Sequence, residues 1–264
     1  MRVKLSKKVT FFLAIPFAVI VFFAVMGILF SAVPTEEELN EKFIVVNPLD
    51  LSQIRAFSKY RSCMGHDYRN PTAQEGIKET TPRSMKHYIK VKEELMGKNE
   101  VVKAIAPFDG KISNIEKSDP ERKPYDQQIW LTPDNGSLSP RQWNFVFFHI
   151  DLRDDLKQGS QVKAGEVIGT AYMTRGPENS TDNFDMAVKF TRPMAEPAVD
   201  FPLAHATDEV LSEYEADGIT LADMEISKEY RDQNLCKTTG DSQAGDVYFE
   251  RNTDPNDMVY LRSQ

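Results

Sequence analysis

Three of the four histidines and two carboxylates of this 264-residue sequence could carry metal or acid–base chemistry. They are His66, Asp67, His87, His149 and Asp185. Imidazole and carboxylate groups bind zinc, and they also act as general acids and bases. If the fold brings them together, His66, His87 and His149 could bind a metal ion beside the carboxylates. The alternative is structural, with histidines hydrogen-bonded in loops and strands and an Asp185 that accepts bonds from the backbone or from a lysine.

The segment that must position these residues, 102–190, has the sequence pattern of a small β core. Short alternating apolar runs are separated by turn residues, such as Pro107-Phe-Asp-Gly110 and the glycines at 159, 165 and 169. Glycine allows tight corners in a sheet because it has no Cβ. We predict strands at 88–91, 111–115, 127–132, 144–151, 166–172 and 185–190.

Helices and further strands are predicted on both sides of this core. Thr35 and Glu38 have the spacing of a capping box, which predicts a short helix over 35–42. A second helix is predicted at 49–58, and residues 62–83 are predicted to form a long surface loop. After a proline-rich linker, helices are predicted at 206–217 and 221–234, and edge strands at 247–249 and 258–261.

The N-terminal segment 11–33 contains no charged residue. As a helix it would extend roughly 35 Å, enough to cross the hydrocarbon core of a bilayer. Four basic residues precede it and four glutamates follow it within 36–41, which places the N-terminus in the cytoplasm and the main domain outside the cell membrane. The alternative is a cleaved signal peptide, but the apolar run is longer than the roughly 7–15 residues typical of one. We therefore expect an uncleaved single-pass anchor.

Five segments follow from these features. They are a cytoplasmic basic tail (1–10), a transmembrane helix (11–33), juxtamembrane helices and a loop (34–100), the β core (101–191), and a C-terminal extension (192–264) of linker, helices and strands that packs on the core. The net charge of −8 and the lack of a basic, aromatic-rich patch exclude nucleic acid as a partner, because phosphate binding needs clustered lysine and arginine.

The two cysteines, Cys63 and Cys236, lie near the two ends of the main domain. An extracytoplasmic location permits a disulfide between them, and two unpaired thiols are the alternative. We expect the disulfide.

The core resembles the duplicated hybrid motif, a barrel-sandwich fold. The resemblance covers about a third of the chain and depends on residues 104–112, Phe147-Phe-His-Ile-Asp151, Gly159-Ser-Gln-Val-Lys-Ala-Gly165 with Gly169, and Asp185-Met-Ala-Val-Lys-Phe190. It implies a barrel-sandwich hybrid core. With the N-terminal transmembrane helix and the small α-rich C-terminal extension predicted above, the chain is expected to be mainly β. One group with this fold is the LytM or lysostaphin-type zinc peptidases, which cut peptidoglycan crosslinks.

The zinc ligands of that peptidase family are not reproduced here. The family's H-x-H strand falls on Asp185-Met-Ala187, so the ligand position is Ala187, whose methyl group cannot bind zinc. The family's H-x-x-x-D falls on Ser84 to Tyr88, and neither end is a usual ligand. His149 alone matches, at the position of the family's additional active-site histidine.

Two other groups share the fold. A glucose-type phosphocarrier would need a second histidine in the hairpin over 116–130, which has none, and an extracytoplasmic location would separate it from its phosphodonor. A membrane-fusion adaptor would need a long helical hairpin and a lipoyl-like turn, and neither pattern is present. The stretches Arg61-Ser-Cys-Met-Gly-His-Asp-Tyr68 and Arg83-Ser-Met-Lys-His-Tyr88 are similar to those of an uncharacterised group of membrane-anchored proteins with this core.

From the sequence, the favoured hypothesis is a membrane-anchored extracytoplasmic domain with a degenerate peptidase-like fold and no cofactor. It would bind an envelope polymer or a protein partner, without catalysis, through a groove bordered by His149 and Asp185. The competing hypothesis is a zinc-dependent envelope hydrolase with rearranged ligands, drawn from His66, Asp67, His87 and His149. A third is a purely structural envelope subunit.

Overall fold

The computed structural model describes residues 26–27, 33–70, 78–117, 124–134, 136, 139–175, 180–193, 195–243, 246–250 and 254–262. The predicted cytoplasmic tail (1–10) lies outside these residues, as does the predicted transmembrane helix (11–33) except for residues 26, 27 and 33. Within the part of the chain that is described, no helix has the length and apolar character needed to cross a bilayer.

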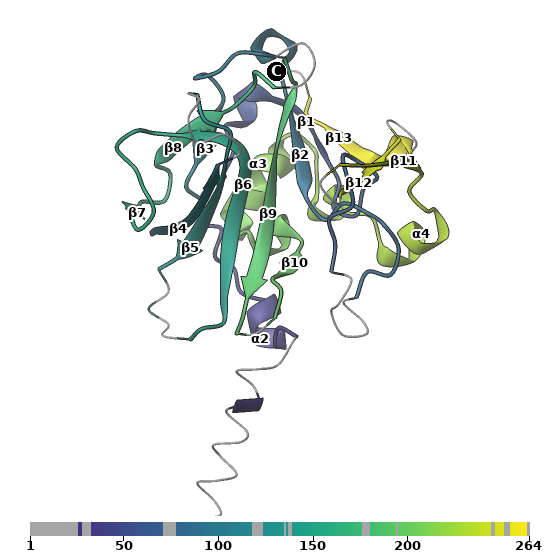
Figure 1. The fold of residues 1–264 in the computed structure, drawn as a ribbon, viewed down its shortest axis with the longest axis horizontal. Helices are drawn as coiled ribbons and strands as arrows, with labels where there is room; N and C mark the ends of the chain where they lie inside the picture. The colour runs from purple at the N-terminus through teal and green to yellow at the C-terminus, as the bar shows by residue number, and fades with distance from the viewer. Residues whose placement is uncertain are drawn as a thin grey trace, which may run out of the picture.

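The body of the molecule is an antiparallel sheet of eleven strands (Figure 1). Its strands are β1 (Ile54–Ser58), β2 (His87–Val91), β3 (Lys103–Ile105), β4 (Gly110–Lys117), β5 (Gln127–Pro133), β6 (Gln142–Leu152), β7 (Gln161–Val162), β8 (Val167–Ala171), β9 (Asn183–Thr191), β10 (Ala198–Asp200) and β13 (Met258–Tyr260). The main path runs β13-β1-β2-β9-β6-β5-β4-β7; β10 pairs with β9, and β8 pairs with β3 and β6. The prediction of a mainly β fold is confirmed, and a strand is present at each of the six predicted core positions.

No sheet formed by the described residues closes into a barrel, which corrects the expectation of a barrel-sandwich core in that respect. The path ends at β13 and β7, and these two edge strands do not pair with each other. The long β6 changes partner along its length: residues 142–148 pair with β9, and residues 150–152 pair with β8. The strands β8 and β3 therefore branch away from the main path instead of closing it.

Strand alternation explains the core. Phe145 and Phe147 of β6 and Phe184 and Met186 of β9 point into one hydrophobic cluster, because alternate residues of a strand face the same side. Where β8 crosses the end of β6, Gly169 lies so close to the carbonyl of residue 151 that a Cβ would collide with it. Glycine is required at this corner because of that close backbone approach.

The helices are short: α2 (Glu36–Leu39), α3 (Asp208–Ala216), α4 (Lys228–Gln233) and the 3₁₀ turns η1 (Leu51–Gln53), η2 (Glu93–Leu95), η3 (Pro202–His205), η4 (Leu221–Met224) and η5 (Pro255–Asp257). The capping box of Thr35 and Glu38 is present at α2, and α3 matches the predicted helix over 206–217.

Two helix predictions were wrong. Residues 49–58 form η1 and then β1, because the segment 54–58 pairs with β2 and β13 and buries Ile54, Ala56 and Phe57 in the sheet. The predicted helix over 221–234 is split into η4 and α4. Between them the backbone of Ile226 bonds to Tyr60, and Ser227 caps a new helix by accepting from the backbone of Tyr230.

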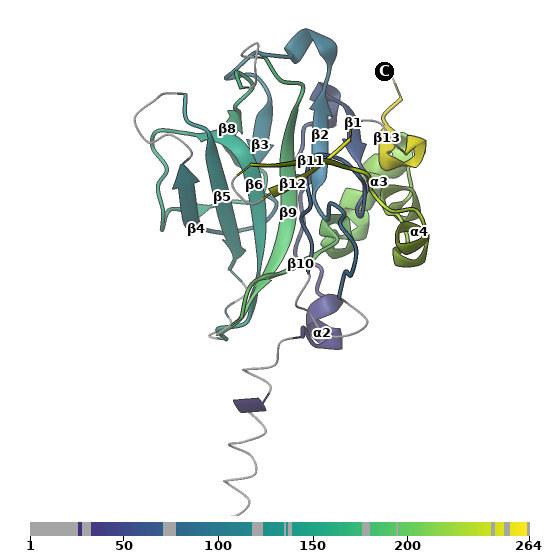
Figure 2. The same cartoon turned by 45° about the vertical axis from the view of Figure 1, so that its right-hand side comes forward.

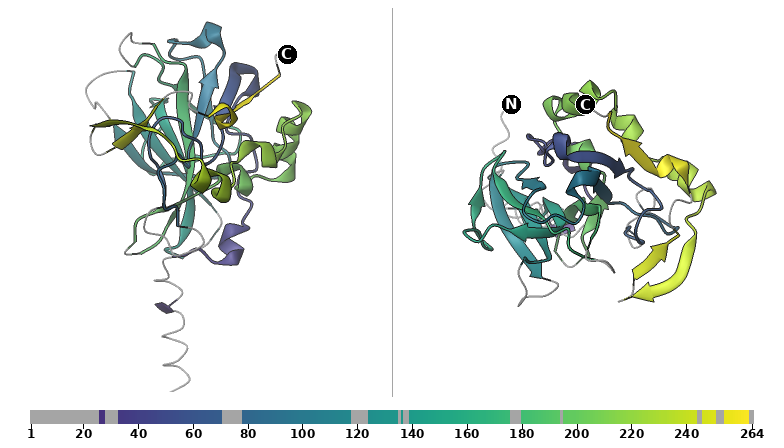
Figure 3. Two further views of the ribbon diagram at one scale, coloured as in Figure 1. Left: turned by 90° about the vertical axis from the view of Figure 1, so that its right-hand side faces the viewer. Right: turned by 90° about the horizontal axis from the view of Figure 1, so that it is seen from above.

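A hairpin of β11 (Thr238–Gln243) and β12 (Asp246–Phe249) stands apart from the main sheet, on the face away from α3 (Figures 2 and 3). The predicted disulfide between Cys63 and Cys236 is confirmed, with a Cα–Cα distance of 5.2 Å. The disulfide joins the loop after β1 to the segment between α4 and the hairpin.

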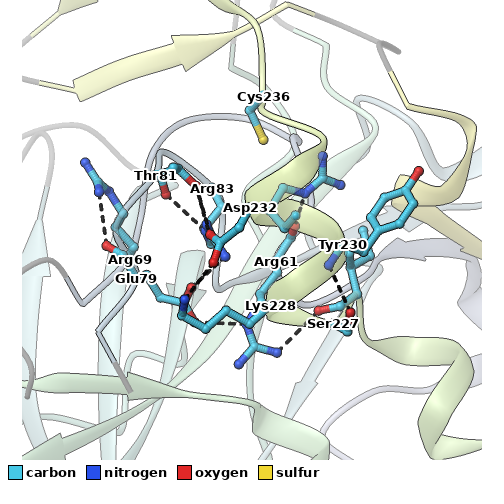
Figure 4. Close-up of polar contacts among 12 residues, drawn as sticks. Arg61, Arg69, Glu79, Thr81, Arg83, Ser227, Lys228, Tyr230, Asp232 and Cys236 are labelled. Carbon is cyan, nitrogen blue, oxygen red and sulfur yellow. Dashed lines mark hydrogen bonds and ion pairs between the residues drawn. The ribbon is translucent and has the colours of Figure 1, made fainter. Parts of the chain in front are cut away.

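A buried charge network beside the disulfide fixes the loop that leads into β2 (Figure 4). Glu79, whose side chain is 1% exposed, pairs with Arg61 at 2.9 Å and with Arg83 at 2.6 Å. Arg83 also pairs with Asp232 of α4, which Lys228 holds at 2.7 Å. Removal of any one partner would leave a buried charge without a counter-charge, which costs free energy. The network therefore strongly favours one position of the loop.

Removal of the disulfide should weaken the whole domain. A variant with both Cys63→Ala and Cys236→Ala should lose about 2–5 kcal/mol of unfolding free energy, because the bond closes a loop of 173 residues in the unfolded chain. Urea unfolding of the full chain, with and without a reducing agent, measures this. If neither the double variant nor the reduced wild type unfolds at a lower urea midpoint than the oxidised wild type, this expectation is contradicted.

Candidate binding site

The candidate site is the face of the sheet opposite the core. In register, Asp185 of β9 lies beside Tyr88 of β2 and Phe148 of β6, and Ala187 lies beside Val146. Alternation places these residues on one face. Lys86, directly before β2, Lys189 of β9 and Trp130 of β5 complete this face, which we call the groove face.

A buried ion pair occupies its centre. Nζ of Lys86 lies 2.8 Å from Oδ2 of Asp185, and the two side chains are 3% and 2% exposed. The same ammonium lies 3.1 Å from Nε2 of His66. An ammonium has only donors, so Nε2 must accept, and Nδ1 of His66 then carries the proton toward the carbonyl of Asp67, 3.1 Å away.

Aromatic rings enclose the Lys86 ammonium. It lies 4.4 Å from the ring centroid of Phe148, 4.7 Å from that of Tyr68 and 5.1 Å from that of Tyr88. Ring faces attract cations, more strongly where water is excluded. Burial by itself would lower the pKa of Lys86, but the charge of Asp185 outweighs it and the pKa lies above its ordinary value.

The pKa of Asp185 is held below its ordinary value. Burial alone would raise it, but the positive charges of Lys86, His149 and Arg175 outweigh burial. The ion pair is therefore charged at neutral pH. One carboxylate oxygen, Oδ1 of Asp185, has no hydrogen-bond partner.

The loop that carries His66 is fixed by the hairpin β11–β12 and by the disulfide. His66 forms a β-bridge with Tyr248 of the hairpin, and Cys63 lies three residues earlier. Gly65 has a positive φ of 68°, and a Cβ there would collide with the ring of Tyr88. Only glycine can bring His66 this close to β2.

An imidazole–carboxylate pair lies at one end of the groove face. Nδ1 of His149 lies 2.9 Å from Oδ1 of Asp126, and the backbone of His149 has a positive φ of 61°. Such a conformation costs free energy in a residue other than glycine. Both residues line a cavity of about 230 Å³, with Glu116, Gln128 and Phe148 among its walls.

Two of the five candidates do not join this site. His87 points to the opposite face, where its ring packs against Phe57 and Phe201 and its Nδ1 lies 2.6 Å from the carbonyl of Ser58. Strand alternation requires this separation, because His87 directly follows Lys86. The carboxylate of Asp67 is engaged by Arg69 at 2.9 Å.

The residues of the groove face do not fit the zinc site of the peptidases. No three His, Cys, Asp or Glu side chains in the described part of the chain are grouped so that they could hold a metal ion. Ala187 offers only a methyl group. Nε2 of His66 and Oδ2 of Asp185, the atoms that could bind a metal, both contact the Lys86 ammonium. The site thus contains a cation of its own.

Reasoning from the histidines missed the residue at the centre of the site and its aromatic surroundings. The pattern around Lys86 held a signal, since Lys86 and Tyr88 alternate with His87 and Ile89 along a strand. A lysine beside a strand that is buried on both faces needs a carboxylate partner. The alternative considered for Asp185, a bond from a lysine, describes its actual contact.

Comparisons of the sequence and the fold with known proteins add little to this description of the site. No family model matches the chain, and no curated protein does either. Among solved structures, the chain is similar to the solution structure of lysostaphin, with 18% identity, a TM-score of 0.31, and coverage of 56% of this chain and 53% of the other. It is also similar to Csd3 of Helicobacter pylori, with 15% identity, a TM-score of 0.31, and coverage of 83% and 45%. The chain spans about half the length of these two proteins, and likenesses of this level carry no argument about its function.

Loss of the Lys86 charge should destabilise the domain strongly. We expect Lys86→Met to lower the unfolding free energy by about 3–5 kcal/mol, because it leaves Asp185 buried without a counter-charge. Adding Asp185→Leu should recover much of the loss, because the double variant buries no charge. Urea unfolding of the four proteins of this cycle measures the coupling, and additive effects would contradict the pairing.

His87 should make the domain sensitive to acid. Burial lowers its pKa to about 4, whereas the unfolded chain titrates near 6.5. Between these values the unfolded state binds a proton that the folded state does not, so stability falls as the pH decreases through this window, by about 3 kcal/mol in total.

The asparagine side chain of His87→Asn keeps an N–H donor for the carbonyl of Ser58, but it does not titrate. Its loss of unfolding free energy between pH 7 and pH 4 should be smaller than that of the wild type by about the same amount. An equal loss in both proteins would contradict this role of His87.

Proposed function

We propose that this chain is a membrane-anchored, extracytoplasmic binding domain. It binds an extended ligand, the peptide part of an envelope polymer or a segment of a partner protein, along the groove face and does not cleave it. The uncharged segment 11–33 supports the anchor. The aromatic and charged side chains of the groove face, with the cavity beside His149, support ligand binding.

The contacts of the Lys86 ammonium support the proposal that the domain does not cleave its ligand. The ammonium contacts Nε2 of His66 and Oδ2 of Asp185, two atoms that a metal at this position would need. A zinc hydrolase also needs an open coordination position for water. Binding a metal here would require the displacement of a buried, ion-paired lysine, which is costly.

The competing function is a zinc-dependent envelope hydrolase with rearranged ligands. One observation favours it: Nε2 of His66 and Oδ2 of Asp185 contact the same ammonium. Movement of Lys86 would leave these groups facing a shared space.

Cosedimentation with purified, insoluble peptidoglycan tests the proposal on the full chain in detergent, with and without zinc. We expect the protein to sediment with the polymer and to release no soluble fragments. Trp130→Ala should reduce sedimentation several-fold, because it removes a partly exposed indole ring from the groove face. Lys111→Ala, on an outward-facing position of β4, is the matched control and should bind as the wild type does.

Release of fragments that requires zinc and is lost in His149→Ala would establish the hydrolase instead. Absence of sedimentation, or sedimentation that Trp130→Ala does not change, would exclude the groove face as a site for this polymer.

A further inference from the structure

Lys189 is a half-buried cation of the groove face without an anionic partner. Its ammonium lies 4.4 Å from the ring centroid of Trp130, 5.1 Å from that of Tyr68 and 5.8 Å from that of Phe148. Among the described residues, no side chain forms a hydrogen bond or an ion pair with it. By contrast, Lys86 on the same face is paired with Asp185.

Two further donors beside Lys189 also lack an acceptor. Nε1 of Trp130 and the hydroxyl of Tyr68 are buried without a hydrogen-bond partner. Each belongs to a ring that the Lys189 ammonium covers. Buried polar groups are nearly always satisfied, so these two buried donors beside an unpaired ammonium point to an acceptor between them.

We propose that Lys189 is the anchor for a carboxylate of the ligand, with the indole N–H of Trp130 as a second donor. A carboxylate has two oxygens, which allows it to accept from both groups at once. The apolar part of the ligand next to this carboxylate would lie against the rings of Trp130 and Phe148. This inference names the ligand chemistry of the proposed binding function and rests on it.

A carboxylate fits better than a phosphate. Phosphate sites typically use arginine forks or several backbone donors, whereas this site offers a single ammonium and two neutral donors. Glu116 also acts electrostatically on Lys189, and its negative charge would repel a dianion more strongly than a monoanion. Burial lowers the pKa of Lys189 to about 8, so a bound anion would also restore its full charge.

Nuclear magnetic resonance of the tryptophan indoles tests the proposal. The chain has two tryptophans, so its spectrum contains two indole N–H signals. The full chain would be titrated with N-acetylglycine, a small carboxylate, and with the neutral N-acetylglycinamide. We expect the Trp130 signal to shift with the carboxylate alone. The Trp143 signal should stay in place, because its N–H donates to the carbonyl of Glu38 at 2.8 Å.

Variants of two lysines complete the test. Lys189→Met should raise the dissociation constant of N-acetylglycine about tenfold or more, since it removes a charged hydrogen bond. Lys189→Arg should retain much of the affinity. Lys111→Met, at an exposed position of β4 outside the cavity, should leave the affinity unchanged. An unshifted Trp143 signal in each variant shows that the fold is intact.

Three outcomes would overturn the proposal: no shift with N-acetylglycine, an equal shift with the amide, or an equal affinity in Lys189→Met. A tighter interaction with inorganic phosphate at matched ionic strength would also overturn it. These outcomes are separate from cosedimentation with peptidoglycan. A chain that binds N-acetylglycine through Lys189 but not the polymer would keep the carboxylate site and exclude peptidoglycan as its ligand.

Discussion

The buried ion pair of Lys86 and Asp185 is the constraint on which the site depends. Two charges removed from water are tolerated only where each satisfies the other and further polar or aromatic groups surround them. Here His66 accepts from the ammonium and three aromatic rings enclose it. The arrangement gives the groove face a fixed internal cation that is part of the chain and is surrounded by aromatic rings.

Segments far apart in the sequence cooperate to hold this cation. The loop with His66 is fixed from one side by the disulfide of Cys63 and from the other by the hairpin β11–β12. The segment leading to Lys86 is fixed by the buried network around Glu79. The main sheet therefore supplies Asp185, while the flanking segments position His66 and Lys86 next to it. This division explains why stabilising features far from the groove matter for its chemistry.

Much of the fold was predictable because strand alternation and turn residues are local signals. The six core strands followed from them. The cap at Thr35 followed from its spacing to Glu38, and the disulfide from the extracytoplasmic location inferred for the two cysteines. The segments 49–58 and 221–234 were mispredicted because sheet pairing and the cap at Ser227 overrode a helical pattern. The site was harder. The sequence shows that Ala187 cannot bind zinc, but it does not show that Lys86 reaches Asp185, since their contact joins residues 99 positions apart.

The Lys86 ammonium occupies the space between His66 and Asp185 that a metal ion bound by both residues would need. Anomalous diffraction at the zinc absorption edge, from crystals of the full chain grown with zinc at neutral pH, tests this claim most directly. We expect no anomalous peak within bonding distance of His66 and Asp185, and the Lys86 side chain between them. A peak at that point, with Lys86 displaced from it, would contradict the claim.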